Sequence, residues 1–411
     1  MHNDIKWNHT FLNLNTMNFK PPDVNPDIFD KYKKINRLII IGNGFDIAHG
    51  LKSTFSDFIS DYCFNAIHQF LNKKEYIDSL ISINTNKSIS NLEKYLADLN
   101  RKDKLNELIR FSEFSEINFS WKSSFFRAII NEIQNKNWVD IEIQYFDHLK
   151  KIKIKKNPND LIILNREFEC IKAQFLTYLN KEMDKNNFSP NSALIDQFKQ
   201  PIKSIETIPN TLKTDKQPDS YCILNFNYTN IAELYKKALN EENTTYIPIH
   251  GQLLGDNIST QGPIFGFGDE MDPEYVNFEL YRNDDLFKYI KSFNYLQFSH
   301  YRNLMEFIDN DNFQVQIFGH SCGMSDRTLL NAVFEHENCI SIKPFYYGVK
   351  ESNDFEKKSY SISRHFKSKA ELRIKVVNKE YCEAMVQPVK KETKLQPDNK
   401  INVEYAKIKY I

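Results

Sequence analysis

Short, continuously apolar runs alternate with segments of helical periodicity along most of the chain. The first run, Leu38 to Ile41, is typical of a strand that is covered on both faces. Similar runs predict strands at 221–226, 245–249, 263–267, 313–318, 340–347 and 372–377. Apolar residues three and four positions apart predict helices at 55–71, 231–239 and 329–334. Because short apolar strands that alternate with helices favour a parallel sheet, we predict an α/β fold with a doubly wound, mostly parallel sheet.

The segment from 75 to 205 has a different pattern. It is rich in Asn and Lys, and its apolar residues recur at helical spacing. No glycine occurs between Gly50 and Gly251, which favours long helices over a turn-rich sheet. We therefore predict a large α-helical insertion, or cap, within the sheet domain. The predicted parts are an N-terminal arm (1–35), the sheet domain (36–74 and 206–380), the α-helical insertion (75–205) and a C-terminal appendage (381–411).

Composition narrows the class of protein. Hydrophobic residues make up 41% of the 411 residues, which excludes a mainly disordered chain. Lys+Arg and Asp+Glu both number 54, so no global charge attracts the protein to nucleic acid or to an anionic membrane. The apolar runs are too short to cross a bilayer, and residues 1–20 hold no signal-peptide core. The six cysteines are scattered without a Cys-x-x-Cys pair, so we expect reduced thiols in a cytoplasmic protein without a metal site.

Glycine and small polar residues follow the first predicted strand directly. Gly42, Asn43 and Gly44 form a turn whose backbone N–H groups can approach a phosphate near the start of a helix. The full Gly-x-Gly-x-x-Gly pattern is absent, and an ordinary tight turn between strand and helix is the alternative. Asp46 is suited either to a hydrogen bond with ribose or to capping the helix.

Asparagines follow the strand predicted at 221–226. In an open α/β sheet ligands bind beyond the carboxyl ends of the strands, so Asn227 is a candidate contact for a ligand or a water molecule. Thr229 and Asn230 are equally well explained as caps of the following helix, because Asn and Thr favour that position.

Three further strand ends carry similar residues. His250 and Gly251 follow the strand at 245–249, and the pKa of a histidine near neutrality suits a general base. For this residue alone, a histidine that only satisfies local hydrogen bonds is the alternative. Gly268 lies after the run at 263–267, and residues 319–326 follow the run at 313–318. Because the carboxyl ends of parallel strands share one edge of a sheet, we predict that these turns converge there.

The order of the motifs resembles that of sirtuins. Sirtuins carry, in chain order, a Gly-Ala-Gly turn, a Gln-Asn-Ile-Asp turn, a His-Gly pair, a Phe-Gly-Glu segment and a Gly-Thr-Ser turn. The counterparts here are Gly42-Asn43-Gly44, Phe226-Asn227-Tyr228-Thr229, His250-Gly251, Phe267-Gly268-Asp269-Glu270 and Gly319-His320-Ser321. Asp46 stands in place of the first-loop serine, Thr229 replaces the aspartate, and the zinc-binding cysteine module is missing. Deacylase activity on proteins is therefore not expected.

The chain resembles the AbiH family of phage abortive-infection proteins more closely still. This resemblance covers most of residues 36–347. It rests on Ile41-Gly-Asn-Gly-Phe-Asp-Ile47, Leu224-Asn-Phe-Asn-Tyr-Thr-Asn230, Ile249-His-Gly-Gln252, Phe265-Gly-Phe-Gly268, Gly319-His-Ser-Cys-Gly323 with Ser325 and Asp326, and Trp138-Val-Asp-Ile-Glu142. It implies a Rossmann-like, sirtuin-like fold in an anti-phage protein that hydrolyses the nicotinamide–ribose bond of NAD or NADP in infected cells.

Under this resemblance Asn227 and His250 are the catalytic residues. Asn227 positions water or ribose, and His250 accepts a proton. NAD or NADP is then the substrate or ligand, a phage-derived product is the expected trigger, and self-association is compatible with the role. The residues expected to bind the nucleotide are Gly42, Asn43, Gly44, Phe45, Asp46, Tyr228, Thr229, Gly251, Gly268, Gly319, His320 and Ser321.

Two other functional classes remain open from the sequence. A nucleotide-binding sensor without catalysis is favoured by the substituted positions, Asp46 and Thr229. An effector that acts on nucleic acid would use the basic run 150–156 to contact phosphates. That run is more typical of a solvated face, because the net charge of the chain is zero.

An acidic pair within the predicted insertion is a further candidate site. Trp138, Asp140 and Glu142 lie close together in the sequence. The interpretation we favour is a tryptophan packed between helices and two solvated carboxylates.

Overall fold

The computed structural model describes residues 34–85, 105–106, 108–109, 117–136, 140–152, 159–253 and 262–389. The predicted N-terminal arm therefore lies outside the described residues except for positions 34 and 35. Residues 390–411 of the predicted C-terminal appendage also lie outside them.

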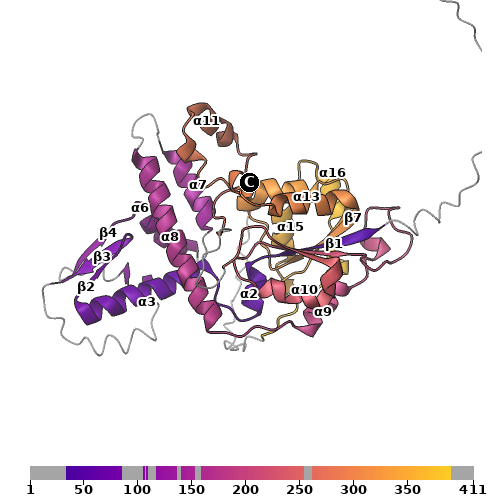
Figure 1. The fold of residues 1–411 in the computed structure, drawn as a ribbon, viewed down its shortest axis with the longest axis horizontal. Coiled ribbons are helices and arrows are strands. Elements are labelled where there is room, and N and C mark those ends of the chain that lie inside the picture. Colours follow the sequence, from indigo (N-terminus) through magenta and orange to yellow (C-terminus); the bar gives the residue numbers. More distant parts are fainter. Residues whose placement is uncertain are drawn as a thin grey trace, which may run out of the picture.

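A five-stranded parallel sheet forms the centre of the larger part of the molecule (Figure 1). Its strands are β1 (Ile35–Ile41), β5 (Tyr221–Asn225), β6 (Thr244–Pro248), β7 (Asn312–Phe318) and β8 (Cys339–Pro344). They are ordered β6-β5-β1-β7-β8, and every neighbouring pair is parallel. The chain thus moves outward from β1 through β5 to β6 and then returns to the other side of β1. The prediction of an α/β fold with a parallel sheet is confirmed.

Helices cover both faces of this sheet (Figure 1). Leu38 and Ile40 of β1 pack in a core with α13 (His300–Asn310), α14 (Arg327–Phe334) and α15 (Phe355–Ser363). Ile39 and Ile41 point to the opposite core, with α2 (Asn43–Ala48), α9 (Ser192–Lys199) and α10 (Leu234–Asn240). Alternate residues of a strand point to opposite faces, so a strand that is buried on both faces is mostly apolar.

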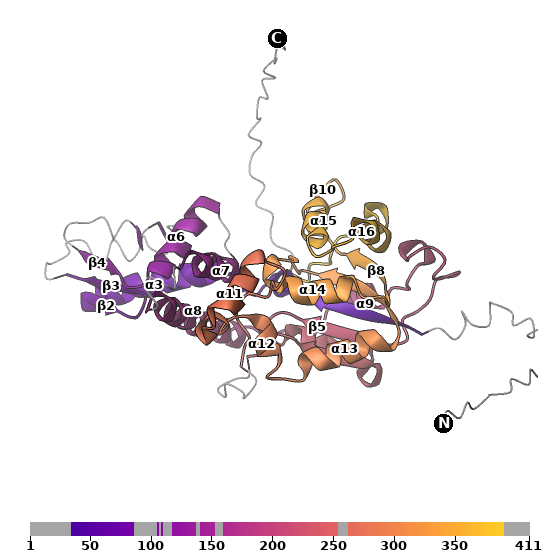
Figure 2. The same cartoon turned by 90° about the horizontal axis from the view of Figure 1, so that it is seen from above.

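A second body of helices lies beside the sheet (Figures 1 and 2). It contains α3 (Phe55–Lys73), α6 (Ser124–Lys136), α7 (Ile141–Lys151) and α8 (Asn159–Asp184), which share one large core with residues 265–290. The helix α3 begins at a capping box between Thr54 and Asp57. We call this second body the helical part.

Besides the helices that the sequence predicts for the insertion, the helical part contains three strands that were not predicted. β2 (Glu75–Ile77), β3 (Ile81–Asn84) and β4 (Asn118–Trp121) form an antiparallel sheet. The turn between β2 and β3 needs no glycine, because Asp78 Oδ1 accepts the N–H groups of Leu80 and Ile81.

Two of the predicted strands, at 372–377 and 263–267, are wrong. Residues 372–377 fall largely in α16 (Lys369–Lys375), because the Ser368 side chain accepts the Glu371 N–H and caps a helix. Residues 263–267 form no strand and make a single bridge, from Phe267 to Ile290. Gly266 has φ +150°, and a Cβ at this position would lie 2.1 Å from the Tyr289 carbonyl oxygen.

The remaining elements complete the sheet side and its junction with the helical part. They are α11 (Pro273–Tyr281), α12 (Lys291–Tyr295) and the short hairpin of β9 (Gly348–Val349) and β10 (Ser352–Asn353). All six cysteines are free thiols, as predicted. No described helix is long and apolar enough to cross a membrane.

Candidate functional site

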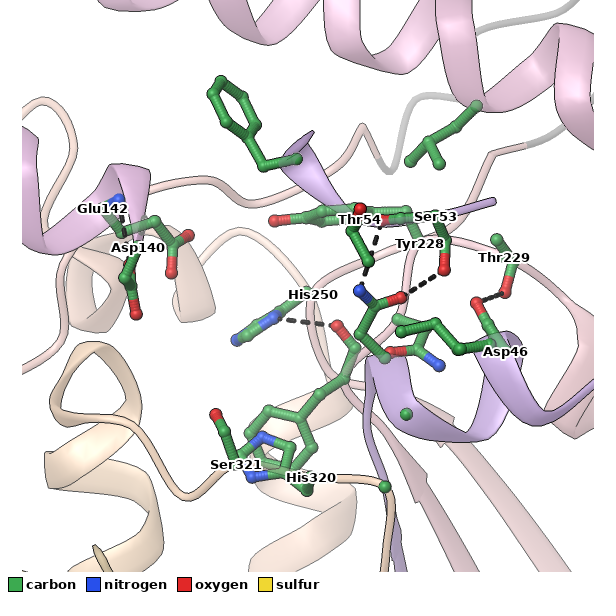
Figure 3. A pocket seen from close by; sticks show the side chains of 18 of the residues that line it. Asp46, Ser53, Thr54, Asp140, Glu142, Tyr228, Thr229, His250, His320 and Ser321 are labelled. Carbon is green, nitrogen blue, oxygen red and sulfur yellow. Dashed lines mark hydrogen bonds between the residues drawn. The ribbon is translucent and has the colours of Figure 1, made fainter. Parts of the chain in front are cut away.

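A cavity of about 400 Å³ opens where the carboxyl ends of β1, β5, β6 and β7 meet the helical part (Figure 3). It brings together residues that are far apart in the sequence, from Asn43 to Asp326. Its lining is Asn43, Gly44, Asp46, Ile47, Ser53, Thr54, Phe55, Asp140, Ile141, Glu142, Phe175, Leu179, Phe226, Asn227, Tyr228, Thr229, His250, Phe265, Gly319, His320, Ser321 and Asp326.

Most of the predicted site residues line this cavity. They are Asn43, Gly44, Asp46, Asn227, Tyr228, Thr229, His250, Gly319, His320 and Ser321. Four do not. Gly42, Gly251 and Gly268 lie in the supporting turns, and Phe45 is fully buried in the core between Phe198 and Tyr235.

The glycines after β1 and β7 allow two turns to pack against each other. A Cβ on Gly42 would lie 2.5 Å from His320 Cα, and one on Gly44 would lie 2.8 Å from Gly319 Cα. The Gly42 and Gly44 N–H groups donate to the carbonyl oxygens of Phe318 and Gly319. Both N–H groups are therefore occupied, and the expectation that they are offered to a phosphate is not met in this conformation.

A buried carboxyl group lies at the other side of these turns (Figure 3). The Thr229 hydroxyl donates to Asp46 Oδ2 at 2.6 Å, and Thr229 therefore does not act as a helix cap. Burial raises the pKa of Asp46 to about 7, while the hydrogen bond from Thr229 opposes this shift. The side chain of Asn43 is fixed nearby by hydrogen bonds with Ser53.

Two buried polar atoms that belong to cavity residues make no hydrogen bond with the described residues. They are Asp46 Oδ1, an acceptor, and the Asn227 Nδ2 amide group, a donor. Asp46 is 1% exposed and Asn227 is 8% exposed. The Asn227 side chain also opposes the rise in the pKa of Asp46, so these two groups face each other and partly compensate for the missing partners.

The turn that carries Asn227 is organised by Asn225. The Asn225 Nδ2 group lies within hydrogen-bond distance of the carbonyl oxygens of Asn227 and Thr229 and of the Tyr246 hydroxyl. Its Oδ1 accepts the Asn227 N–H at 3.1 Å. Asn230 makes no side-chain cap hydrogen bond, so the cap interpretation fails for this residue too.

His250 is held from both of its ring nitrogens. Nδ1 lies 3.2 Å from the Phe226 carbonyl oxygen, which requires a proton on Nδ1. Nε2 lies 3.3 Å from the Tyr295 hydroxyl and 3.2 Å from Asp326 Oδ1. Burial keeps Tyr295 a phenol by raising its pKa, so its hydroxyl can donate to Nε2. Nε2 therefore has two neighbours, a hydroxyl group that can donate to it and a carboxylate oxygen that can accept from it, and the tautomer of the ring decides between them.

A buried ion network lies behind His250. The fully buried Lys291 Nζ is 2.7 Å from Asp326 Oδ1 and 2.8 Å from Glu142 Oε2. Although burial alone would raise it, the positive charge of Lys291 holds the pKa of Asp326 below its ordinary value. Asp326 is the N-cap residue of α14 but makes no side-chain cap hydrogen bond there, because its oxygens face these partners.

Asp140 and Glu142 are cavity residues, so the interpretation of solvated carboxylates is wrong. The docking of α7, in which Phe146 stacks on Phe267 at 3.9 Å, leaves the Asp140 and Glu142 side chains only partly exposed. Asp140 Oδ1 caps α7 by accepting the N–H groups of Glu142 and Ile143. Burial raises the pKa of both carboxyl groups, and Lys291 opposes the shift. Trp138 lies outside the described residues.

The side chain of His320 also lines the cavity, and its imidazole ring is neutral. Its Nδ1 accepts the Cys322 N–H at 3.0 Å, so the proton is on Nε2, 3.7 Å from Asp326 Oδ2. Burial lowers the pKa of His320 to about 3. Among the described residues, no group of three or more His, Cys, Asp or Glu is arranged to hold a metal ion.

Sequence reasoning missed part of this site. Lys291 and Tyr295 lie in a segment without a distinctive pattern, and no sequence signal could have found them. Asp140, Glu142 and Asp326 stood inside motifs that resemble the AbiH family, which was the available signal. In the view of Figure 3 the two acidic side chains of α7 lie on one side of the His250 ring, and Asp46 and Thr229 lie on the other.

The fold defines an α/β protein with a cavity, lined by polar and apolar side chains, between a parallel sheet and a helical part. The model of the family described as bacteriophage abortive infection AbiH matches residues 38–348. The chain therefore belongs to the AbiH family, which indicates a role in abortive infection by bacteriophage. No curated protein matches the chain.

Proposed function

We propose that this AbiH protein hydrolyses the bond between nicotinamide and ribose in NAD or NADP. The observation that carries the proposal is the convergence of Asn227, His250 and the unpartnered oxygen of Asp46 on one cavity. The cavity lies at the carboxyl ends of parallel strands, at the point where the strand order reverses around β1. In doubly wound sheets this reversal is where dinucleotides bind, and the order β6-β5-β1-β7-β8 matches the first five strands of that arrangement.

The chemistry of the cavity suits the departure of nicotinamide. The C1′–N bond breaks, its electron pair leaves with the neutral pyridine, and the ribose passes through an oxocarbenium-like transition state, so no strong acid is needed. Asp326, Glu142 and Asp140 place carboxyl groups near this developing positive charge. Water then adds to C1′, and His250 Nε2 accepts its proton. The imidazolium formed would be stabilised by the Phe226 carbonyl and by Asp326.

A second cavity supports a dinucleotide rather than a smaller ligand. It has a volume of about 380 Å³ and shares Gly44, Ile47, Gly319, His320 and Ser321 with the first. Its outer lining includes the exposed Tyr347, which offers aromatic surface to a base, and the buried Lys358. A nucleotide that extends across the shared turn would occupy both cavities.

A sensor that binds the nucleotide without cleaving it is the second candidate. The observation that favours it is that Gly42 and Gly44 have no free N–H group and that Nε2 of His250 already contacts Tyr295 and Asp326. The nucleic-acid effector gains no such support. Lys150 is paired with Asp147 and Asp272, and residues 153–156 of the basic run lie outside the described residues.

Turnover of purified protein separates these functions. NAD and NADP are incubated with the protein, with and without phage lysate, and the products are separated by chromatography. We expect free nicotinamide from the wild type and a loss of about 100-fold or more in His250→Ala, because a general base typically contributes that much. Asn227→Ala should also lose activity, because it removes a group that positions water or ribose. The exposed His68→Ala is the matched control and should retain activity.

Other results of these experiments would support one of the alternative functions or refute the proposal. Nucleotide binding without nicotinamide release would favour the sensor, and salt-sensitive retention of DNA or RNA would favour the effector. Absence of both binding and release for either nucleotide, in the presence of lysate, would refute the proposal. Thermal unfolding of each variant shows whether a loss of activity is a loss of fold.

A further inference from the structure

The second cavity contains a buried positive charge beside the turn that it shares with the first cavity. Its volume is about 380 Å³, and Gly319, His320 and Ser321 of this turn line both cavities. Lys358, on α15, lines the second cavity and is 8% exposed. Among the described residues that line either cavity, Lys358 is the one lysine, and none is an arginine. A ligand that spans both cavities therefore meets its fixed positive charge at this position.

The buried lysines of the described residues are not equally well paired. They are Lys291, Lys343, Lys358 and Lys375. In three of them a carboxylate oxygen lies 3.2 Å or less from Nζ. Lys358 Nζ lies 3.8 Å from Asp354 Oδ2 and donates one long hydrogen bond, of 3.4 Å, to the His320 carbonyl oxygen. An ammonium group has three N–H donors, so the pairing of Lys358 is incomplete.

Lys375 shows how the same kind of lysine is paired when no cavity lies beside it. It is 5% exposed and pairs with Glu371, four positions earlier in α16, at 3.2 Å. Its Nζ also donates to the carbonyl oxygens of Phe334 and His336, at 3.2 and 2.9 Å. Lys358 also has an acidic residue four positions earlier, but its contacts are fewer and longer. Because a buried charge without partners is costly, we expect the missing partner of Lys358 in the cavity.

The position of this ammonium group matches that of the diphosphate of a dinucleotide. In NAD and NADP a single methylene group separates the nicotinamide ribose ring from the first phosphate. A ribose in the first cavity therefore places the diphosphate close to the turn of residues 319–321. The Lys358 ammonium group contacts this turn at the His320 carbonyl oxygen, and the exposed Ser321 offers a hydroxyl group to both cavities.

The glycine turn after β1 does not supply phosphate donors in this conformation. The N–H groups of Gly42 and Gly44 already donate to backbone carbonyl oxygens. We propose that the second cavity is the diphosphate subsite, in which the Lys358 ammonium group and the Ser321 hydroxyl donate to phosphate oxygens. This inference rests on the proposed function, in which a dinucleotide spans both cavities. A lysine binds phosphate as a point charge, so it needs no exact geometry from the diphosphate.

The ion pair with Asp354 does not explain why Lys358 is buried. The Asp354 side chain is 40% exposed, and its Oδ1 accepts the Tyr347 N–H at 2.6 Å. A pair with so exposed a carboxylate contributes little to stability. Asp354 also lines the second cavity, so its negative charge opposes that of a phosphate bound there. The two side chains of this pair should therefore affect phosphate binding in opposite directions.

Binding of ADP-ribose tests the subsite without turnover. ADP-ribose keeps the diphosphate and lacks nicotinamide, and isothermal titration calorimetry measures its dissociation constant. Lys358→Gln should weaken binding by about 10- to 100-fold, because a hydrogen bond between charged groups is lost. Asp354→Asn should tighten binding by roughly fivefold, because a negative charge near the phosphates is removed. The amide oxygen of this variant can still accept the Tyr347 N–H.

Lys375→Gln is the matched control. Lys375 is a buried lysine with an acidic residue four positions earlier, but it lines neither cavity. Its substitution should lower the free energy of unfolding and leave the affinity for ADP-ribose unchanged. A general loosening of α15 would weaken binding in both Lys358→Gln and Asp354→Asn, so opposite effects of these two variants identify a direct role of the charge.

Three results would overturn the diphosphate subsite. They are a wild type that does not bind ADP-ribose, a folded Lys358→Gln with wild-type affinity, and an Asp354→Asn whose affinity is unchanged or weaker. If Lys358→Gln does not fold, the titration of Asp354→Asn decides alone. If the wild type releases no nicotinamide while the titrations behave as expected, the hydrolase proposal fails and the subsite stands. If the wild type releases nicotinamide and Lys358→Gln binds ADP-ribose normally, the subsite fails and the hydrolase proposal stands.

Discussion

Replacing Asp46 by asparagine is expected to stabilise the protein at high pH and to weaken nucleotide binding. Asp46 is 1% exposed, and its pKa is raised from 3.8 to about 7 in the folded protein. Because the folded pKa is the higher one, the protonated form is favoured by folding. The contribution of Asp46 to the free energy of unfolding is therefore fully present at low pH and is lost as the pH rises through about 7.

The size of the effect follows from the shift. Each pKa unit corresponds to about 1.4 kcal/mol, so ionising Asp46 costs the folded state about 4 kcal/mol above neutrality. An asparagine side chain at this position would not ionise, and its amide oxygen could still accept the Thr229 hydroxyl. Asp46→Asn should therefore gain up to about 4 kcal/mol over the wild type at about pH 8 and little at about pH 4.

Urea unfolding at both pH values measures this difference. The exposed Asp196→Asn should show no change, and Asp269→Asn should be destabilised, because Asp269 is buried beside Arg327 at 3.1 Å. Nucleotide binding by Asp46→Asn should fall, since the unpartnered acceptor Oδ1 becomes a donor. A gain in stability with a loss of binding is expected where function maintains a costly group. An equal effect at both pH values, or destabilisation at high pH, would refute the reasoning.

Three further variants test the support of the cavity. Gly319→Ala should lower the free energy of unfolding by about 1–3 kcal/mol and weaken nucleotide binding, because φ is +66° and the new Cβ would lie 2.2 Å from the Phe45 nitrogen. Urea unfolding measures the loss, and Gly262→Ala, which has open space around it, is the control. Glu206→Ala should cost about 3–5 kcal/mol in the same assay, because it leaves Lys343 buried without its carboxylate, while nicotinamide release per folded molecule stays unchanged. Asn225→Ala should lower nicotinamide release with the sheet still folded by circular dichroism, since the turn of Asn227 loses its hydrogen bonds; full activity in this variant would contradict the role assigned to that turn.

The strands of the main sheet were predictable because they are buried on both faces. Leu38 to Ile41 are apolar at every position, and alternate residues of this run enter opposite cores. The convergence of the polar turns that follow these strands was also predictable, because the carboxyl ends of parallel strands meet at one edge of a sheet. The small antiparallel sheet was missed because Asp78 makes its turn without a glycine signal.

The ion network of Lys291, Glu142 and Asp326 was not predictable from the local sequence pattern. Lys291 is buried by segments that are distant in the sequence, and its partners lie on α7 and at the start of α14. Asp140 and Glu142 look like solvated residues until α7 docks against Phe267. Charge and burial here are set by tertiary packing, which periodicity does not encode.

A crystal structure of His250→Ala soaked with NAD is the most direct test of the account, because this variant should bind the nucleotide without cleaving it. We predict that the nicotinamide ribose lies in the cavity, with its hydroxyl groups bonded to Asp46 Oδ1 and Asn227 Nδ2. A cavity that holds only water at saturating NAD, or a nucleotide bound away from these two side chains, would contradict the account.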